Sequence, residues 1–299
     1  MFDTTPTLDC AGRPLKLDRP RICGVLNLTS DSFSGDGLAR DVRAAVGRGL
    51  EMVEEGADLL DIGAESTRPG AQPVSGEDEI ARVVSVIELL ARETDLPISI
   101  DTSKPEVMRA AVHAGAGLIN DVYALRRDGA LAAAAELKVP VCLMHMQGEP
   151  RTMQEAPHYD DVVGEVHRFL AERVFACEMA GMDKRRVLVD PGFGFGKTLE
   201  HNLALLRGLE RFRDLAGGVL VGLSRKSMLG ALTGRDPRCR ATASAAAALI
   251  AVQRGATIVR VHDVAQTRDA LSVWQAVHAG DELPRTSRKP ETPRWPDED

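Results

Sequence analysis

The chain has 299 residues, of which 44% are hydrophobic and 27% charged, a composition typical of a globular protein with one large α/β domain or two smaller ones. Its net charge of -7 and pI near 5.6 give no basic surface for nucleic acid or an anionic membrane, so an anionic ligand requires a local basic pocket. The five cysteines lack C-x-x-C spacing, and neither a signal peptide nor an apolar run of roughly 18 residues is present, so we expect a soluble cytoplasmic protein with reduced thiols.

Residues 1–20 are predicted to form a small hairpin or extended segment. From there to about residue 280, short β-rich apolar runs alternate with longer helical patterns. The eight runs predicted to be strands are 21–28, 59–65, 97–101, 117–121, 139–145, 186–192, 218–224 and 257–263. Strands that alternate with helices over roughly 250 residues indicate a single-domain (β/α)₈ TIM barrel, assigned to residues 21–280, with a doubly wound open sheet as the alternative.

The helical segments between these runs have recognisable ends. In the segment 103–115, Ser103 is predicted to cap the helix, Pro105 lies in the first turn and Gly115 follows the end. A longer periodic segment, 160–181, stops at Gly181. The alanine-rich helix near 241–248 permits close approach to the barrel or to a second subunit, and the charged, proline-rich tail 281–299 is predicted to be disordered.

Polar residues close nearly every predicted strand. They are Asn27, Asp61, Glu65, Asp101, Asn120, Asp121, His145, Asp190, Ser224, His262 and Asp263. In a barrel the carboxyl ends of all strands meet at one rim, so these residues predict a binding face there. The alternative for any one of them is a turn or a cap for the next helix.

Two long loops after the first two strands are rich in glycine. The loop 26–39 contains Gly35 and Gly37, and the loop 65–76 contains Arg68. Loops of this kind at a barrel rim are able to close over a ligand, and Arg68 would then supply charge for an anionic group. The alternatives are an ordinary connection and a solvated arginine.

Two kinds of ligand chemistry follow from the strand ends. Asp101, Asn120 and Asp190 offer acceptors and donors that suit a planar heterocycle with ring nitrogens and an amino group. Basic residues follow the last two strands, where many barrels bind phosphate: Arg225 and Lys226 beside Ser224 and Ser227, then Arg260 with His262. For Arg260 the alternative is a salt bridge inside the barrel, and for His262 a buried core histidine.

The loop "DPGFGFGKT", 190–198, misses the nucleotide-binding pattern G-x-x-x-x-G-K-[ST] by one residue, because Pro191 occupies the first glycine position. It also follows a late strand rather than the first one. Lys197 therefore either fixes the loop or is solvated. No spacing of histidines or cysteines indicates a structural zinc site, whereas a Mg²⁺ held mainly by substrate phosphate needs only one protein oxygen.

Eight motifs in this order resemble the dihydropteroate synthase family. They are "GVLNLTSDSF", "DIGAESTRPGA", "SIDTSKPEVM", "INDV", "CLMHMQG", "DPGFGFGKT", "GLSRKSMLG" and "RVHDV", spanning about Gly24 to Val264. The resemblance implies the barrel fold, a homodimer, and an enzyme that joins 6-hydroxymethyl-7,8-dihydropterin diphosphate to p-aminobenzoate, yielding 7,8-dihydropteroate and pyrophosphate.

The resemblance also implies roles for individual residues. The pterin would be bound by Asp101, Asn120, Met144, Asp190 and Lys226. The diphosphate would be bound by Asn27, Arg260 and His262, with Asn27 also holding Mg²⁺. The p-aminobenzoate site would be shaped by Thr67, Arg68, Phe195, Lys226 and Ser227, and Asp61 would lie near the pterin and diphosphate. The residues expected to act in catalysis are Asp101, Asp190, Lys226, Arg260 and His262.

The implied chemistry is a dissociative loss of pyrophosphate, followed by attack of the aniline nitrogen on a pterin cation. The first loop departs from the family pattern, with Ser30 in place of proline and Gly35 and Asp36 in an altered glycine segment. A missing proline loosens the open loop, which bears on p-aminobenzoate affinity and sulfonamide sensitivity. Two other functions remain open: a methyltetrahydrofolate:corrinoid methyltransferase, disfavoured by the basic motifs, and a catalytically silent pterin-binding paralogue.

Overall fold

The computed structural model describes residues 6–28, 38–66, 72–149 and 152–278, with the backbone alone for 38–41. The predicted disordered tail lies outside these residues. So do Ser30, Gly35, Asp36, Thr67 and Arg68, which belong to the two rim loops.

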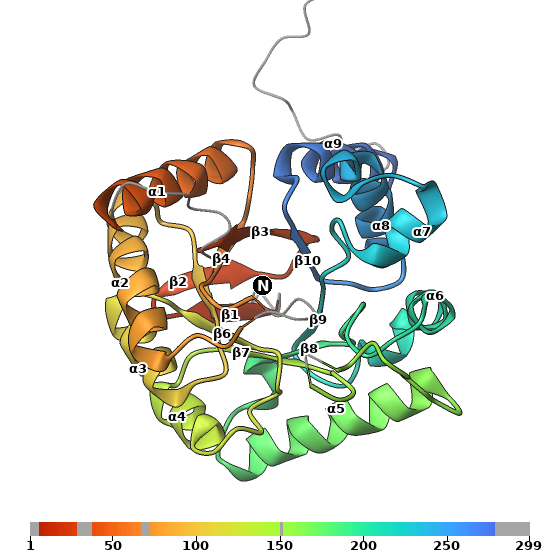
Figure 1. Ribbon diagram of the computed structural model, residues 1–299, viewed down its shortest axis with the longest axis horizontal. Helices are drawn as coiled ribbons and strands as arrows, with labels where there is room; N and C mark the ends of the chain where they lie inside the picture. Colours follow the sequence, from red (N-terminus) through yellow and green to blue (C-terminus); the bar gives the residue numbers. More distant parts are fainter. Residues whose placement is uncertain (1–5, 29–37, 67–71, 150–151, 279–299) are drawn as a thin grey trace, which may run out of the picture.

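Eight parallel strands of the described chain close into a barrel (Figure 1), in the order β10-β3-β4-β5-β6-β7-β8-β9. Their bounds are β3 Arg21–Asn27, β4 Leu59–Gly63, β5 Ile98–Asp101, β6 Leu118–Asp121, β7 Val141–Met144, β8 Val187–Asp190, β9 Gly218–Val221 and β10 Ile258–Val261. Each predicted run contains one of them. The last strand pairs with both the first and the seventh barrel strand, which confirms the barrel and excludes the open sheet.

Helices surround this barrel and cover the outward faces of the strands (Figure 1). Their bounds are α1 Leu38–Glu54, α2 Gly76–Glu93, α3 Pro105–Ala114, α4 Ala130–Leu137, α5 Val162–Met179, α6 Leu199–Arg207, α7 Ser227–Thr233, α8 Ala241–Gln253 and α9 Val264–His278. Three short 3₁₀ helices are η1 Lys184–Arg186, η2 Leu209–Phe212 and η3 Pro237–Cys239. The eight barrel strands bury residues on both faces, as apolar parallel strands require.

The ends of α3 correct one prediction. Pro105 opens the helix and Gly115, at φ +120°, ends it, as the sequence indicates. Ser103, however, does not cap it: the capping position belongs to Lys104, without a side-chain hydrogen bond. The Ser103 hydroxyl instead donates to buried Asp121 on the neighbouring strand, a charge-assisted bond that competes with helix capping. The long helix α5 ends before Gly181 at φ +86°, as predicted.

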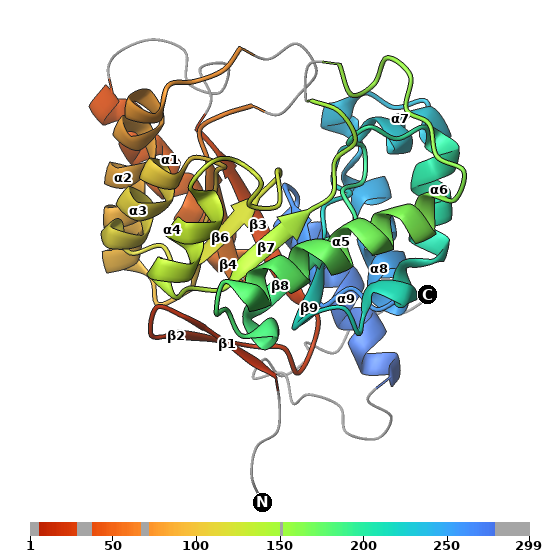
Figure 2. The same cartoon turned by 90° about the horizontal axis from the view of Figure 1, so that it is seen from below.

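The N-terminal residues close the far end of the barrel. An antiparallel hairpin, β1 Thr7–Cys10 and β2 Arg13–Lys16, lies under the barrel floor (Figure 2). Its Leu8, Cys10 and Leu15 are almost fully buried against side chains from the barrel interior. At Gly117 an added Cβ would lie 2.3 Å from the Cys10 carbonyl oxygen, so this close approach requires glycine.

The alanine-rich helix α8 packs chiefly into the core. Its buried residues are Ser244, Ala245, Ala247, Ala248, Ala251 and Val252, and it lies beside α9. Small side chains let the helix backbone approach its neighbours closely. Ile250 on α8 and Val273 and Val277 on α9 remain exposed.

Candidate active site

The side-chain alternation of the strands decides which polar residues enter the barrel. Successive residues of a strand point to opposite faces. Below the mouth, Cys142 and Leu188 belong to the interior cluster at the barrel floor. Two residues further along the same strands, Met144 and Asp190 therefore face the same interior, and they are partners in the register of β7 and β8. Asp101 and Asn120 pair in the same way between β5 and β6.

A buried ionic network occupies the centre of this mouth. Arg260 donates from Nε to Asp61 Oδ2 and from Nη2 to Asp101 Oδ2, at 2.8 Å for the second bond. Asn120 Nδ2 donates to the same Asp61 oxygen at 3.1 Å. The interior salt bridge weighed for Arg260 is thus present in this structure. One cation faces two carboxylates, so the network carries an excess negative charge.

Burial and the neighbouring charges shift the pKa values of Asp101 and Arg260. Burial raises the pKa of Asp101 to about 7; Arg260 opposes the rise and Asp61 adds to it. Burial alone would lower the pKa of Arg260, but Asp61 and Asp101 outweigh it and raise that pKa. The second oxygen of Asp61, Oδ1, is buried and has no hydrogen-bond partner among the described residues. A buried carboxylate oxygen without a partner suits a ligand that donates a hydrogen bond.

The loop 190–198 forms one wall of the mouth. Asp190 begins it and accepts from the Gly192 N–H at 2.8 Å. Burial raises the pKa of Asp190, whereas Lys226 lowers it. Lys197, whose role the sequence left open, is only 3% exposed, and its ammonium bonds to the carbonyls of Gly192 and Phe195 at 2.9 Å each. It therefore fixes the loop and is not solvated.

Lys226 joins this wall to the adjacent loop. Its Nζ donates to the Phe193 carbonyl and lies 4.5 Å from the centroid of the Phe195 ring, a cation–π contact. Burial lowers the pKa of Lys226 to about 8, with Asp190 opposing the shift. Ser227 follows as the first residue of α7.

The backbone before Lys226 is strained. Arg225 has φ +59°, the left-handed region that residues other than glycine rarely adopt. Two residues hold it there: Ser244 Oγ accepts from its N–H at 2.9 Å, and Arg240 Nη1 donates to its carbonyl at 3.0 Å. The Arg225 side chain pairs with Asp263. These bonds pin the turn that places Lys226 over Phe195, a use of strain typical of functional sites.

An apolar patch with four buried members completes the mouth. Met144, which the sequence named, lies there with Val122, Met146 and Met153, and Tyr123 and Phe195 pack against them. The sequence reasoning missed Val122, Met146 and Met153. Met146 could have been predicted, because it follows the inward-facing Met144 by two residues. Flexible methionines beside an aromatic ring suit one face of a flat ligand.

A separate cavity of about 390 Å³ brings together the predicted diphosphate residues Asn27 and His262. Its lining is Val25, Leu26, Asn27, Ala44, Ala45, Arg48, Met52, Arg225 and His262. His262 is held through Ser224 Oγ, 3.1 Å from its ring Nδ1. Arg260, the third predicted diphosphate residue, does not line this cavity and faces the carboxylates instead.

Several strand-end residues face outward and organise turns, the alternative the sequence had raised. Asp121 accepts from the N–H groups of Tyr123 and Leu125 at 2.8 Å each. Glu65 pairs with Lys104 at the rim. Outward-facing His145 lies against Lys197, with its ring 4.9 Å from that of Phe169.

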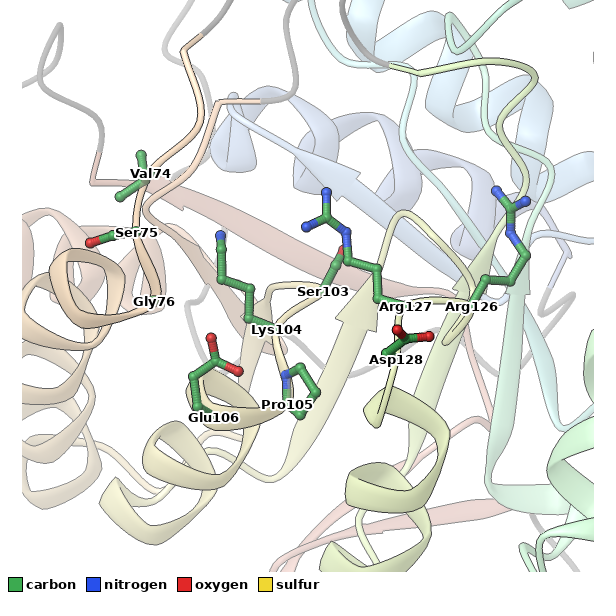
Figure 3. Close-up of a pocket in the computed structure, with 10 residues that line it drawn as sticks. All are labelled: Val74, Ser75, Gly76, Ser103, Lys104, Pro105, Glu106, Arg126, Arg127 and Asp128. Atoms are coloured by element: carbon green, nitrogen blue, oxygen red, sulfur yellow. The ribbon is translucent and has the colours of Figure 1, made fainter.

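A larger cavity, about 570 Å³, lies between the segments that follow β4, β5 and β6 (Figure 3). It is lined by Val74, Ser75, Gly76, Ser103, Lys104, Pro105, Glu106, Arg126, Arg127 and Asp128. None of the predicted site residues is among them. Of its basic side chains, Lys104 bonds to both Glu65 and Glu79, whereas the Arg127 guanidinium lies over the Tyr123 ring.

The described residues contain no cluster of three or more histidine, cysteine or acidic side chains able to hold a metal ion. Asn27 supplies a neutral carboxamide oxygen beside His262 and two arginines. This donor set fits Mg²⁺ only if a ligand brings anionic oxygens, since Mg²⁺ prefers several oxygen donors. Within the described ranges, every helix is too short or too polar to span a bilayer.

Both the sequence and the fold are similar to those of known proteins. Residues 23–262 match the family described as pterin binding enzyme. Dihydropteroate synthase of Escherichia coli (strain K12) is 49% identical over 274 residues, covering 92% of this chain and 97% of that protein. The solved Xanthomonas albilineans dihydropteroate synthase with 4-aminobenzoic acid has a TM-score of 0.88 and 63% identity, covering 92% of this chain and 99% of the other. The same enzyme in complex with 7,8-dihydropteroate has a TM-score of 0.84, 60% identity and the same coverage.

Proposed function

The chain belongs to the pterin-binding enzyme family, among the dihydropteroate synthases, and from this premise we propose which of its residues condense the pterin diphosphate with p-aminobenzoate. One observation carries the assignment. Arg260, two carboxylates and Asn120 meet in a buried network, and Lys226 joins Phe195 beside it at the same mouth. The mouth of the barrel therefore has separate contacts for a heterocycle, for an anion and for an aromatic carboxylate.

The pterin is assigned to the deepest part of the mouth. Asp101, Asn120 and Asp190 supply the acceptors and donors for its ring nitrogens and amino group. Met144 and its neighbours supply an apolar face. Asp61, whose role the sequence could not fix, holds both Asn120 and Arg260 through one oxygen. We assign it the role of fixing the orientation of these two side chains.

The diphosphate is assigned to Asn27, Arg260 and His262. Arg260 uses Nε and Nη2 on carboxylates, while Nη1 makes no hydrogen bond to the described part of the chain. That nitrogen is available to a phosphate oxygen. Mg²⁺, held by Asn27 and phosphate oxygens, would neutralise charge on the leaving pyrophosphate.

The p-aminobenzoate is assigned to Phe195, Lys226 and Ser227. The Phe195 ring gives an aromatic wall, and the Lys226 ammonium attracts the carboxylate. Thr67 and Arg68, also assigned to this site, lie outside the described residues.

The reaction then follows from the placement of charge. Loss of pyrophosphate leaves a positive methylene carbon conjugated with the pterin ring, and the negative charges of Asp101 and Asp190 stabilise it. Arg260 and His262 stabilise the departing pyrophosphate. The aniline nitrogen attacks the cation and then releases its proton, so neither a covalent enzyme intermediate nor a strong base is needed. Exclusion of water prevents capture of the cation as an alcohol.

Two other functions fit less well. A methyltetrahydrofolate:corrinoid methyltransferase has no use for a cavity that joins Asn27, His262 and two arginines. A silent paralogue would retain the pterin contacts without turnover. The atypical first loop is the basis of that alternative, and it lies outside the described residues.

We expect the purified protein, given both substrates and Mg²⁺, to release pyrophosphate in proportion to the 7,8-dihydropteroate formed. A chelator should suppress this release, because Mg²⁺ neutralises leaving-group charge. A coupled pyrophosphate assay with chromatography of the pteroate product measures both. Tight pterin binding without pyrophosphate would identify the silent paralogue, and methyl transfer from methyltetrahydrofolate the other class. Repeating the assay with a sulfonamide tests drug sensitivity.

We expect kcat/KM for p-aminobenzoate to fall above a pH of about 8. Burial lowers the pKa of Lys226 to about 8, and only the protonated form attracts a carboxylate. Measuring kcat/KM for p-aminobenzoate as a function of pH tests this. In a Lys226→Arg variant the remaining activity should lose this alkaline limb, since arginine stays charged. An unchanged limb in the variant would assign the titration to another group.

We further propose a cytoplasmic homodimer. The exposed apolar residues Ile250, Val273 and Val277 on α8 and α9 support a subunit contact there. Sedimentation of the assayed preparation as a monomer would contradict it.

A further inference from the structure

The loop after β8 is pressed tightly against the preceding strand's loop. Gly192, Gly194 and Gly196 all have positive φ, between 61° and 78°. A Cβ at Gly192 would lie 1.8 Å from the His145 carbonyl oxygen, and one at Gly196 would lie 2.4 Å from the Gln147 carbonyl oxygen. Gly192 and Gly196 are therefore required by close contact with backbone, and Gly194 is favoured by its positive φ. A segment of this kind is flexible unless other contacts fix it.

Lys197 lies beneath this loop and provides such contacts. Burial lowers the pKa of Lys197 well below its ordinary value, and Asp190 opposes this shift; in its protonated form the amine has three N–H donors. Its Nζ lies 2.9 Å from each of three acceptors: the Gly192 carbonyl, the Phe195 carbonyl and His145 Nδ1. The lysine forms no hydrogen bond with a carboxylate of the described chain, although it is only 3% exposed. A buried lysine whose partners are backbone carbonyls and an imidazole serves the geometry of the loop.

His145 completes the arrangement as an acceptor. With Nδ1 facing the ammonium, the ring proton resides on Nε2 and the imidazole is neutral. Burial, and to a smaller extent the charge of Lys197, lowers the pKa of His145 to about 2, which agrees with a neutral ring. Its edge-on contact with Phe169 holds the plane of the imidazole.

The residues held by Lys197 are those that face the second substrate. Its bond to the Phe195 carbonyl fixes the backbone that carries the aromatic wall. Lys226 contacts the same ring and bonds to the Phe193 carbonyl of the same loop. Asp190, by contrast, is held by the Gly192 N–H and by the His145 N–H on its own carbonyl, at 3.0 Å. These two hydrogen bonds to Asp190 do not involve the Lys197 amine, although its charge lowers the pKa of Asp190.

We propose that Lys197, through its bonds to two loop carbonyls and His145, is a positioning residue that preforms the p-aminobenzoate site. It contacts no substrate and acts through the loop backbone that carries Phe195. The inference rests on the proposed function for its kinetic effect. Its structural effect on the loop is measurable without turnover.

The test compares Lys197→Met, which keeps length and volume but removes the three donors, with the wild type. We expect the KM for p-aminobenzoate to rise about tenfold, with the KM for the pterin diphosphate and kcat changed less than about threefold. Equal rises in both KM values, or no rise in either, would overturn the proposal. The matched control is Arg173→Met, which removes a cation bonded to the carbonyls of Ala124 and Leu125 in another rim loop. It should not raise the KM for p-aminobenzoate selectively.

A second pair of variants covers the case in which Lys197→Met does not fold. His145→Gln retains an acceptor oxygen for Lys197, whereas His145→Phe retains an aromatic ring without one. The phenylalanine variant should show the selective rise in the KM for p-aminobenzoate. The glutamine variant should keep this KM close to that of the wild type. Identical KM values in the two would contradict the proposal.

Amide hydrogen exchange separates failure of this inference from failure of the proposed function. Residues 192–197 should exchange faster in Lys197→Met than in wild type, even if no dihydropteroate is formed. Unchanged exchange there would overturn the positioning role on its own. A wild type without turnover, together with faster exchange in the variant, would instead refute the proposed function alone.

Discussion

Replacing Arg260 by methionine is expected to lower kcat/KM for the pterin diphosphate by about 10³-fold, because a charge that stabilises the leaving group is lost. The same change should destabilise the fold. It leaves Asp61, whose side chain is 1% exposed, and Asp101 without their cation. Removing one partner of a buried ion pair typically costs about 3–5 kcal/mol. Steady-state kinetics and urea unfolding at a pH of about 8 measure the two effects.

The loss of stability should depend on pH. A carboxyl group whose pKa is raised by folding destabilises the native state increasingly as pH rises from its ordinary pKa to the raised one, and by a constant amount above that. The deficit of Arg260→Met should therefore be larger at pH 8 than at pH 5. Adding Asp61→Asn removes one unpaired charge and should restore part of the stability but not the activity. The control is Arg109→Met, which breaks an exposed pair with Glu136 and should change stability by less than about 1 kcal/mol. A full-activity Arg260→Met would remove Arg260 from the mechanism.

Replacing Asp101 by asparagine should abolish most activity while stabilising the protein. The carboxylate that faces the developing pterin cation disappears, so kcat should fall about 10²- to 10³-fold. The pKa of Asp101 is raised to about 7, from an ordinary value of 3.8, and its side chain is 18% exposed. Its charge therefore opposes folding above pH 4, most fully above pH 7. Asparagine leaves Arg260 paired one to one with Asp61.

The measurement is the free energy of unfolding of both proteins at pH 5 and pH 8. The advantage of Asp101→Asn should be about 2 kcal/mol greater at pH 8 than at pH 5. The control is Asp183→Asn on the exposed surface. Arg185 lowers the pKa of Asp183 to about 2, so this group stays ionised across the range and its replacement should give a difference independent of pH. If the stability difference between Asp101→Asn and the wild type were also independent of pH, the charged network would be refuted.

The barrel was predictable because its strands are continuous apolar runs separated by helical periodicity, and each run contains an observed strand. The polar strand ends were predictable as a set. Which of them enter the mouth was harder to predict. Adjacent residues such as Asn120 and Asp121 have similar side chains, but these point to opposite faces of the strand. Strand alternation separates them once one inward residue is known.

The partners of these residues were not predictable from spacing. Arg260 reaches Asp61 and Asp101 across 199 and 159 residues of chain, because barrel closure brings the last strand beside the first. The error at Ser103 has a similar origin: a carboxylate on the neighbouring strand offered its hydroxyl a better partner than the helix did. Lys197 stayed ambiguous because its burial depends on how the glycine loop folds over it.

The hairpin beneath the barrel affects the order in which the two substrates bind. Leu8, Cys10 and Leu15 fill the floor, so among the described residues the hairpin blocks entry to the interior from below. The pterin is assigned to the depth of that mouth and p-aminobenzoate to its rim. A rim substrate that arrives first obstructs the route of the deeper one. The plugged floor thereby favours a compulsory sequence, in which the pterin diphosphate binds before p-aminobenzoate.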